Sequence, residues 1–306
     1  MLERLHPPLD WASLQAQWPH SAHSRFVHAA GLRWHVQIMG QGPALLMLHG
    51  TGASTHTWHA LAPLLMPHHT LICPDLPGHA FTEQAPGTGM SLPGMAAGVA
   101  ALVQALGLSL QGLVGHSAGA AVAAQMLLQE RLPLTQASTV LVGLNPAWLP
   151  LPGWAGVLFS PSAKLMALNP LSGWLMAQQG ARAGVLQRLL DSTGSRLGPE
   201  AAAHYGVLLR NARHVRGVLA MMAAWNLNPL ARRLHALPAQ VHLHIGMADQ
   251  TIPPALAQEA LQRIPGSTGT QAMGLGHLAH EEGAAEVAQH VLRWLAGAAT
   301  AAPMAE

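Results

Sequence analysis

Apolar runs of strand length alternate with longer segments of helical pattern along most of the chain. The predicted strands that follow an N-terminal hairpin are Ala44–Leu48, Thr70–Cys73, Leu110–Val114, Ser138–Val142, Val241–Ile245 and Gly269–Met273. The predicted helices between and after them are His56–Leu65, Ser91–Leu106, Ala118–Glu130, Ala255–Arg263 and Ala284–Leu295. Strands that are apolar throughout are typical of parallel sheets buried on both faces. The pattern therefore predicts an α/β fold, with a mostly parallel central sheet and helices on both of its faces.

Turn and cap residues support this assignment near the N-terminus. Arg25–Ala29 and Leu32–Met39 flank Ala30-Gly31, which predicts a β-hairpin. Ser54 and Thr55 are the two candidate N-caps for the helix that follows them.

One long segment interrupts the alternation. Residues 151–235 contain several helix-like stretches rich in Trp, Met and Leu, and no convincing strand. The simplest interpretation is a helical cap inserted between two strands of one sheet. We therefore expect residues 1–150 and 236–306 to form the α/β core and 151–235 to form the cap.

Composition and charge narrow the function classes. Half of the 306 residues are apolar, 9% are charged and the formal net charge is +2, so a large core is available and a basic nucleic-acid face is absent. Cys73 is the single cysteine, which excludes an intrachain disulfide. Residues 1–24 lack the apolar core of a secretory signal, and the charge-free stretches are broken by Gly, Pro, Ser and Gln. We expect a cytoplasmic protein without membrane spans.

The motif Gly115-His116-Ser117-Ala118-Gly119 carries the clearest chemical signal. It follows the apolar strand Leu110–Val114 and opens an Ala-rich helix, which is the strand–turn–helix setting of a G-x-S-x-G nucleophile elbow. Glycines at both ends allow strand and helix to approach without Cβ clashes. The alternative is a small-residue turn with an ordinary serine. The context favours Ser117 as the nucleophile of an α/β-hydrolase fold.

A second glycine-containing loop, His49-Gly50-Thr51-Gly52, follows the strand Ala44–Leu48 directly. In α/β-hydrolases a loop at this place supplies one donor of the oxyanion hole, and the residue after the nucleophile supplies the other. We therefore assign the donors to the backbone N–H groups of Thr51 and Ala118, with His49 as a structural brace for the loop.

The acid and the base of such a site follow the serine in chain order. Asp249 lies in a loop beyond the strand Val241–Ile245, and His277 follows Gly276 beyond the next predicted strand. The predicted catalytic residues are thus Ser117, His277 and Asp249. Two rivals remain open: His280 as the base and Asp75 as the acid.

The chain holds 20 histidines, which raises the question of a metal. The pairs His68-His69 and His242/His244 have no carboxylate or cysteine at a recognisable ligand spacing. We expect neither a metal nor a cofactor in the reaction.

The large apolar side chains of residues 151–235 have two interpretations. Most of them pack the cap against itself and onto the sheet. A cap over the site also predicts a wide apolar pocket for a large flat or lipid-like ligand. The candidate substrate-binding residues are Trp154, Met166, Trp174, Met221, Met222 and Trp225. Phe159, Leu165 and Leu168 offer a peripheral contact with a membrane surface as a further hypothesis.

Together these motifs resemble one family in particular. The similarity lies in seven segments: residues 31–36, 49–56, 75–79, 90–95, 115–119, 192–197 and 276–282. They look like the α/β-hydrolase-type magnesium-chelatase accessory proteins (the BchO family) encoded with bacteriochlorophyll-synthesis genes. The resemblance runs from about Ser24 to the final helix and includes the cap. One departure is Ala80, where the family is expected to have glycine.

The resemblance implies a role in bacteriochlorophyll synthesis near the insertion of magnesium into protoporphyrin IX. Two functions remain open because fold does not fix function. The first is a serine hydrolase acting on an apolar ester, of a tetrapyrrole or of its prenyl tail. The second is a non-catalytic accessory protein that binds a porphyrin or the subunits of magnesium chelatase.

Overall fold

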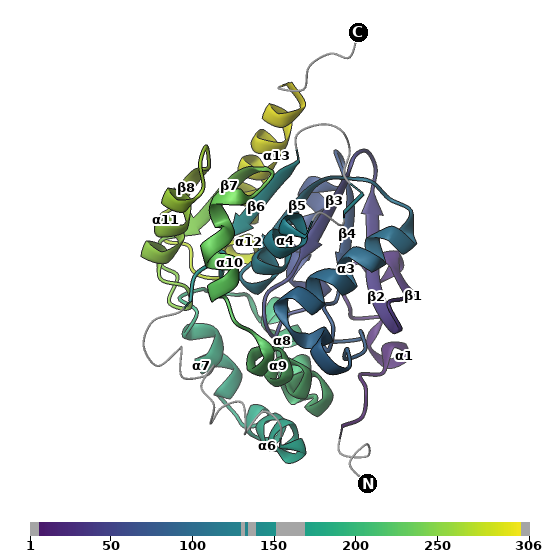
Figure 1. Ribbon diagram of the computed structural model, residues 1–306. Coiled ribbons are helices and arrows are strands. Elements are labelled where there is room, and N and C mark those ends of the chain that lie inside the picture. The colour runs from purple at the N-terminus through teal and green to yellow at the C-terminus, as the bar shows by residue number, and fades with distance from the viewer. Residues whose placement is uncertain (1–5, 130–131, 134–138, 151–168, 301–306) are drawn as a thin grey trace.

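The computed structural model describes residues 6–129, 132–133, 139–150 and 169–300. Its strands form one eight-stranded sheet in the order β1-β2-β4-β3-β5-β6-β7-β8 (Figure 1). The strands are β1 (Ser24–Ala29), β2 (Leu32–Gly40), β3 (Ala44–Leu48), β4 (Thr70–Pro74), β5 (Leu110–His116), β6 (Val140–Leu144), β7 (Gln240–Gly246) and β8 (Thr268–Ala272). From β4 to β8 all neighbours are parallel, while β1, β2 and β4 pair antiparallel. The predicted α/β class and N-terminal hairpin are confirmed.

Alternating side chains of the strands build one core on each face of the sheet. In β3, Leu46 and Leu48 join one cluster, and Leu45 and Met47 join the other. The first face is covered by α3 (Leu92–Leu106), α4 (Ala118–Leu128), α10 (Asn228–Arg233) and α11 (Pro254–Arg263). The second is covered by α2 (Ala62–Leu65), α12 (Ala279–Glu282) and α13 (Ala284–Thr300). Both faces of the inner strands β3, β4, β5 and β6 are thus buried, which explains their uninterrupted apolar runs.

Several element boundaries differ from the sequence prediction. The predicted helix His56–Leu65 is divided into a 3₁₀ turn, η3 (Thr55–Trp58), capped by Ser54, and α2. Pro63 sits in the first turn of α2, where its missing N–H costs nothing, so the helix restarts there. Strand β6 lies two residues later than expected because Leu144 pairs with His116 of β5. Helix α13 continues to Thr300, beyond the predicted end at Leu295.

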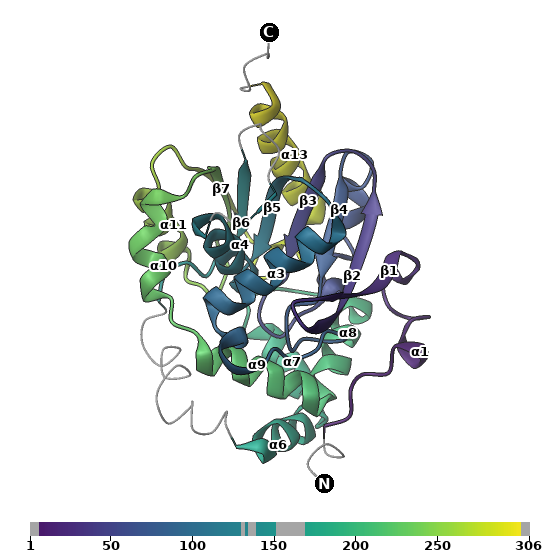
Figure 2. The ribbon, with the colours of Figure 1, turned by 45° about the vertical axis from the view of Figure 1, so that its right-hand side comes forward.

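Between β6 and β7 the described chain is helical. It comprises α6 (Pro170–Gly180), α7 (Val185–Asp191), α8 (Pro199–Arg210), α9 (Ala212–Ala224), α10 and the 3₁₀ turn η6 (Leu234–Ala236). Figures 1 and 2 place α6 to α9 together at one end of the sheet. Helix α9 packs closely on the core, since a Cβ built on Gly217 would lie 1.9 Å from the Gly78 carbonyl oxygen. Residues 151–168, the first part of the expected cap, lie outside the described residues.

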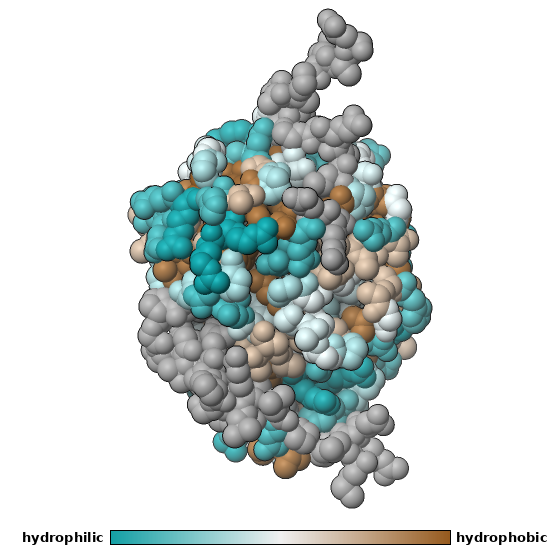
Figure 3. Space-filling model, in the orientation of Figure 1, coloured by the Kyte–Doolittle hydropathy of each residue, from teal (hydrophilic) through white to brown (hydrophobic). Residues whose placement is uncertain are grey.

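The surface shows few large apolar areas on the face drawn in Figure 3, where hydrophobic residues form small separate patches. Leu171, Leu175 and Met176 of α6 are among the exposed large apolar side chains. Within the described residues, no helix has both the length and the hydropathy needed to cross a bilayer.

A buried carboxyl group joins α8 to the core. Oε1 of Glu281, in α12, accepts hydrogen bonds from the Tyr205 hydroxyl (2.5 Å) and from the Thr57 hydroxyl (2.6 Å). Its Oε2 has no hydrogen-bond partner among the described residues and lies 3.5 Å from His59 Nδ1. Burial raises the pKa of Glu281 to about 8. The two hydroxyl donors stabilise the ionised form and lower the pKa, but their effect is smaller than that of burial.

This raised pKa predicts a pH dependence of stability. The folded protein binds the Glu281 proton more tightly than the unfolded chain, so the stabilisation is complete below the unfolded pKa of 4.5 and is lost as pH rises through about 8. Glu281→Gln, which stays neutral, should remove a slope of about 1.4 kcal/mol per pH unit from the free energy of unfolding over this interval. Urea denaturation at a series of pH values measures it. Glu259→Gln, at an exposed carboxyl, is the control that keeps the slope. Equal slopes in the wild type and Glu281→Gln would contradict the assignment.

Candidate active site

Ser117 stands at the junction of β5 and α4 with a backbone that favours glycine, at φ 50° and ψ −116°. Its N–H donates to the Leu144 carbonyl at 3.0 Å, and its carbonyl accepts from the Ala120 and Ala147 N–H groups at 3.2 and 3.1 Å. Contacts on both sides of the residue therefore hold the strained conformation. The side chain is buried but reaches a cavity at the end of the sheet.

The two glycines of the motif are required by close approach of the backbone. A Cβ on Gly119 would lie 2.0 Å from the carbonyl oxygen of Leu48, and one on Gly115 would lie 2.4 Å from Ala120 Cα. Helix α4 can therefore start directly beside the end of β3 only with glycine at these positions. This contact brings the Gly50–Gly52 loop next to Ser117.

The predicted oxyanion donors border the same cavity. Thr51 and Ala118 both line it, and Ala118 is the first residue of α4, so its N–H has no partner within the helix. His49 braces the loop: its Nδ1 contacts the Gly50 carbonyl at 2.8 Å, and its Nε2 accepts from the Leu76 N–H at 2.9 Å. Burial lowers the pKa of His49, which keeps the ring neutral and able to both donate and accept.

His277 and Asp249 are in direct contact. Nδ1 of His277 lies 2.7 Å from Oδ2 of Asp249, and both side chains are buried. Oδ1 of Asp249 accepts from the N–H groups of Thr251 (2.7 Å) and Ile252 (2.8 Å), so the carboxylate is held by its own loop. Because Nδ1 faces the carboxylate, Nε2 is the nitrogen that remains for Ser117 or a substrate. His277 lines the cavity with Ser117, and no hydrogen bond between their side chains is recorded in the described part of the chain.

Asn145 ties together the two loops that carry this pair. Its Nδ2 donates to the carbonyls of Gly276 (2.8 Å) and His277 (2.9 Å), and its Oδ1 accepts from the Gly246 N–H at 2.7 Å. It adopts a positive φ of 44°, which asparagine tolerates better than most residues. His116 adds a contact of 2.9 Å between its Nε2 and the His277 carbonyl.

The turn between α7 and α8 packs against the same loops. The Thr193 carbonyl accepts from the N–H groups of His277 (3.1 Å) and Gln250 (3.3 Å), and the Ser195 hydroxyl accepts from the Leu278 N–H at 2.8 Å. Gly194 is essential to this packing, since a Cβ there would lie 2.0 Å from the Ala248 carbonyl oxygen. The helical segment thus supports the loops of Asp249 and His277.

The rival base, His280, is placed away from the cavity. It is fully buried in α12, with Nε2 2.7 Å from the Thr57 hydroxyl and its ring against Trp58. Burial holds its pKa well below the ordinary value, with a smaller effect from His277.

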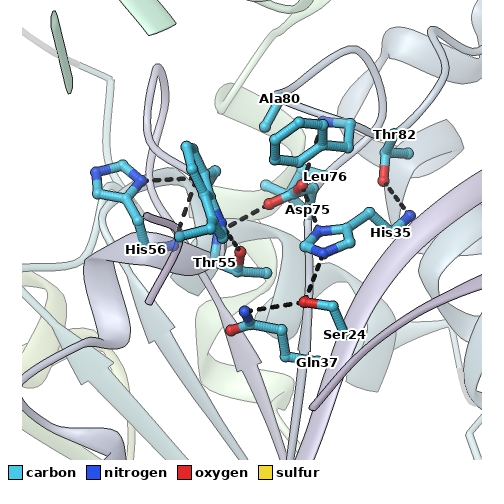
Figure 4. A network of polar contacts seen from close by, with 12 residues as sticks. Ser24, His35, Gln37, Thr55, His56, Asp75, Leu76, Ala80 and Thr82 are labelled. Atoms are coloured by element: carbon cyan, nitrogen blue, oxygen red, sulfur yellow. Dashed lines mark hydrogen bonds and ion pairs between the residues drawn. The ribbon is translucent and has the colours of Figure 1, made fainter. Parts of the chain in front are cut away.

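The rival acid, Asp75, belongs to a separate buried network (Figure 4). Its Oδ2 contacts His35 Nδ1 at 2.8 Å and accepts from the Phe81 N–H, and its Oδ1 accepts from the Thr55 N–H at 2.8 Å. Burial alone would raise the pKa of Asp75. The charge and hydrogen bond of His35, together with His49 and the Thr55 N–H, favour the carboxylate more strongly, so the pKa is lowered. Asp75 fixes the turn that follows β4 against η3.

The cavity beside Ser117 has a volume of about 400 Å³ and a mainly apolar wall. Of the predicted ligand-binding residues, Met221, Met222 and Trp225 line it. Trp174 does not, because it lies on α6 with a partly exposed side chain. Trp154 and Met166 lie outside the described residues, as do Phe159, Leu165 and Leu168. Leu189, Leu190, Leu227 and Tyr205 also line the cavity and were not singled out from the sequence.

Sequence reasoning also missed the supporting residues Asn145, Ser195 and His116. The one local signal is for Asn145, a residue tolerant of positive φ that follows the apolar strand β6 directly. Within the described residues, the side chains of His244, Glu286 and His290 lie close enough together to hold a metal ion. This group lies outside the cavity beside Ser117.

Comparisons with known proteins show the family and the fold of the chain. Residues 43–284 match the family described as alpha/beta hydrolase fold. The "Magnesium-chelatase 30 kDa subunit" of Rhodobacter capsulatus is 34% identical over 94% of this chain and 100% of its own length.

Solved structures show the same fold at low sequence identity. A putative lipase from Acinetobacter baumannii superposes with a TM-score of 0.76 at 19% identity, over 96% of this chain and 98% of that one. An esterase from Thermogutta terrifontis superposes with a TM-score of 0.70 at 22% sequence identity, over 90% of this chain and 98% of that one. Three findings identify the family: the strained Ser117 between β5 and α4, the family match, and the similarity to one relative over nearly the whole chain. The chain belongs to the α/β-hydrolase fold family and, within it, to the family of the magnesium-chelatase 30 kDa subunit.

Proposed function

We propose that the protein is a serine hydrolase that cleaves an ester of an apolar substrate, in bacteriochlorophyll biosynthesis near magnesium insertion. The observation that carries the proposal is the 2.7 Å contact of Asp249 with His277, beside a cavity shared by His277 and Ser117. A nucleophile in a strained turn, a base held by a buried acid and free amide donors are the parts that acyl transfer needs.

In the proposed reaction the Ser117 oxygen attacks the ester carbonyl while Nε2 of His277 takes the hydroxyl proton. The oxyanion is stabilised by the N–H groups of Thr51 and Ala118, each worth roughly 10²–10³ in rate. Collapse breaks the ester bond, and His277 returns the proton to the leaving alcohol. Water then attacks the acyl group on Ser117 by the same route and releases the acid. Asp249 holds the His277 tautomer throughout.

The wall of the cavity supports an apolar substrate. Met221, Met222 and Trp225 come from α9 and its end, so we propose that residues 151–235 form a cap over the site. A volume of about 400 Å³ lies in the lower part of the range for small-molecule sites. It suits a prenyl or acyl chain, or one edge of a tetrapyrrole that carries the ester.

Ser117→Ala should abolish turnover of small activated esters, because no other group supplies the nucleophile in the proposed reaction. His277→Ala should lower kcat by a similar factor, about 10³ or more. Release of nitrophenol from short-chain nitrophenyl esters measures both. His28→Ala, at an exposed strand position, is the matched control and should keep full activity. Turnover that is equal in Ser117→Ala and the wild type would rule out the proposed nucleophile.

A second function is favoured by a different observation, the printed name of the Rhodobacter capsulatus relative. A chelatase subunit need not be a hydrolase, so the protein would instead bind porphyrin or the chelatase on a hydrolase scaffold. In that case association with chelatase subunits would persist in Ser117→Ala, and no ester would be cleaved by the wild type.

The hydrolase function and the porphyrin-binding form of the second function both predict an apolar ligand in the same cavity. Protoporphyrin IX and its magnesium form should bind saturably, and Met222→Ala should weaken binding about tenfold through loss of apolar contact. Met176→Ala, on the exposed face of α6, is the matched control and should bind as the wild type does. Tryptophan fluorescence, corrected with free tryptophan for inner-filter quenching, follows the titration. If Met222→Ala and Met176→Ala bind the tetrapyrroles with equal affinity, the cavity beside Ser117 is not the binding site.

A further inference from the structure

Three potential ligands for a metal ion meet on the face of the sheet covered by α13. His244 lies on β7, and Glu286 and His290 lie on α13. One ligand atom of each residue lies within 4.8 Å of the others. None of the three lines the Ser117 cavity or has a role in the proposed reaction.

His244 is the residue that needs an explanation. Its side chain is fully buried, and neither ring nitrogen has a hydrogen-bond partner among the described residues. A buried polar group without a partner is costly and is rare in folded proteins. The nearest charged atom is Glu286 Oε1, 3.8 Å from Nε2. Burial lowers the pKa of His244 to about 4, so the ring is neutral at pH 7 and presents a lone pair.

We propose that His244, Glu286 and His290 bind a transition-metal dication of the Zn²⁺ type, with water completing the coordination. Two imidazole nitrogens and one carboxylate form a three-residue set that zinc accepts in proteins. Magnesium and calcium prefer sites made of oxygen ligands, so this donor set selects against both ions.

The backbone positions suit such a site. Glu286 and His290 are four residues apart on α13, so their side chains share one face of the helix. Ligand atoms of a tetrahedral zinc lie about 3.3 Å apart, given bonds of about 2.0 Å. The three groups must therefore close by up to about 1.5 Å from their limit of 4.8 Å, and the half-exposed side chain of Glu286 has the freedom to move.

Neighbouring groups hold the outer histidine in place. The Thr270 hydroxyl lies 3.3 Å from His290 Nδ1, the kind of contact that orients a ligand histidine. The His290 ring also lies 5.7 Å from the ring of Trp294, which stacks on His242. A bound ion would join β7 to α13 and thereby stabilise the end of the sheet from which the Asp249 loop emerges.

Calorimetric titration of the tag-free, full-length protein with zinc chloride tests the proposal. The wild type should bind one equivalent of zinc, and Glu286→Ala and His290→Ala should each weaken it about tenfold or more. Both substitutions lie near the surface of α13, and circular dichroism verifies that the variants fold. His235→Ala, at an exposed histidine of η6, is the matched control and should bind zinc as the wild type does.

A thermal unfolding series gives an independent readout. Zinc should raise the Tm of the wild type and of His235→Ala but not of the Glu286→Ala/His290→Ala double variant, and magnesium should raise none of them. The proposal is overturned if the wild type binds no stoichiometric zinc. It is equally overturned if zinc binds the double variant as tightly as the wild type, which would place the ion on other histidines.

Discussion

Close backbone packing around Ser117 is the constraint on which the rest of the site depends. Helix α4 starts against the end of β3 because Gly119 leaves room for the Leu48 carbonyl oxygen, and Ser117 at the start of this helix adopts a positive φ. The same approach brings the Thr51 loop beside the serine and turns the N-terminus of α4 toward the cavity. One tight junction thus sets the position of the proposed nucleophile and of both proposed oxyanion donors.

The other half of the site depends on polar contacts between distant segments. Asp249 and His277 lie on separate loops, and Asn145 hydrogen-bonds to backbone groups of both connections. Thr193, from the helical segment between β6 and β7, accepts a hydrogen bond from the His277 backbone. The helices that wall the cavity therefore also support the residues that face it. The wall of the proposed substrate cavity and the loop of the proposed base therefore share one structural support.

Much of the fold follows from local pattern, because parallel strands buried on both faces need continuous apolar runs, and Gly31 and Gly107 mark the turn after β1 and the end of α3. The motif at Ser117 and the chain order predicted Asp249 and His277, which the structure brings together. Long-range contacts could not be predicted in this way. The wall of the cavity depends on how α9 packs, the contact of His244 with Glu286 depends on how α13 packs, and the hydrogen bonds of Asn145 depend on how two distant loops meet. Ala80 is instructive, since its φ of 42° explains why glycine is expected there.

The central claim is that Ser117 is an activated nucleophile, and labelling by a fluorophosphonate probe tests it without knowledge of the substrate. Such a probe reacts with a serine whose hydroxyl is deprotonated by a neighbouring base. Mass spectrometry of the digested wild-type protein should find one label, on the peptide that contains Ser117, and the label should be absent after His277→Ala. A folded wild-type protein that takes up no label, or takes it up at another serine, would contradict the account.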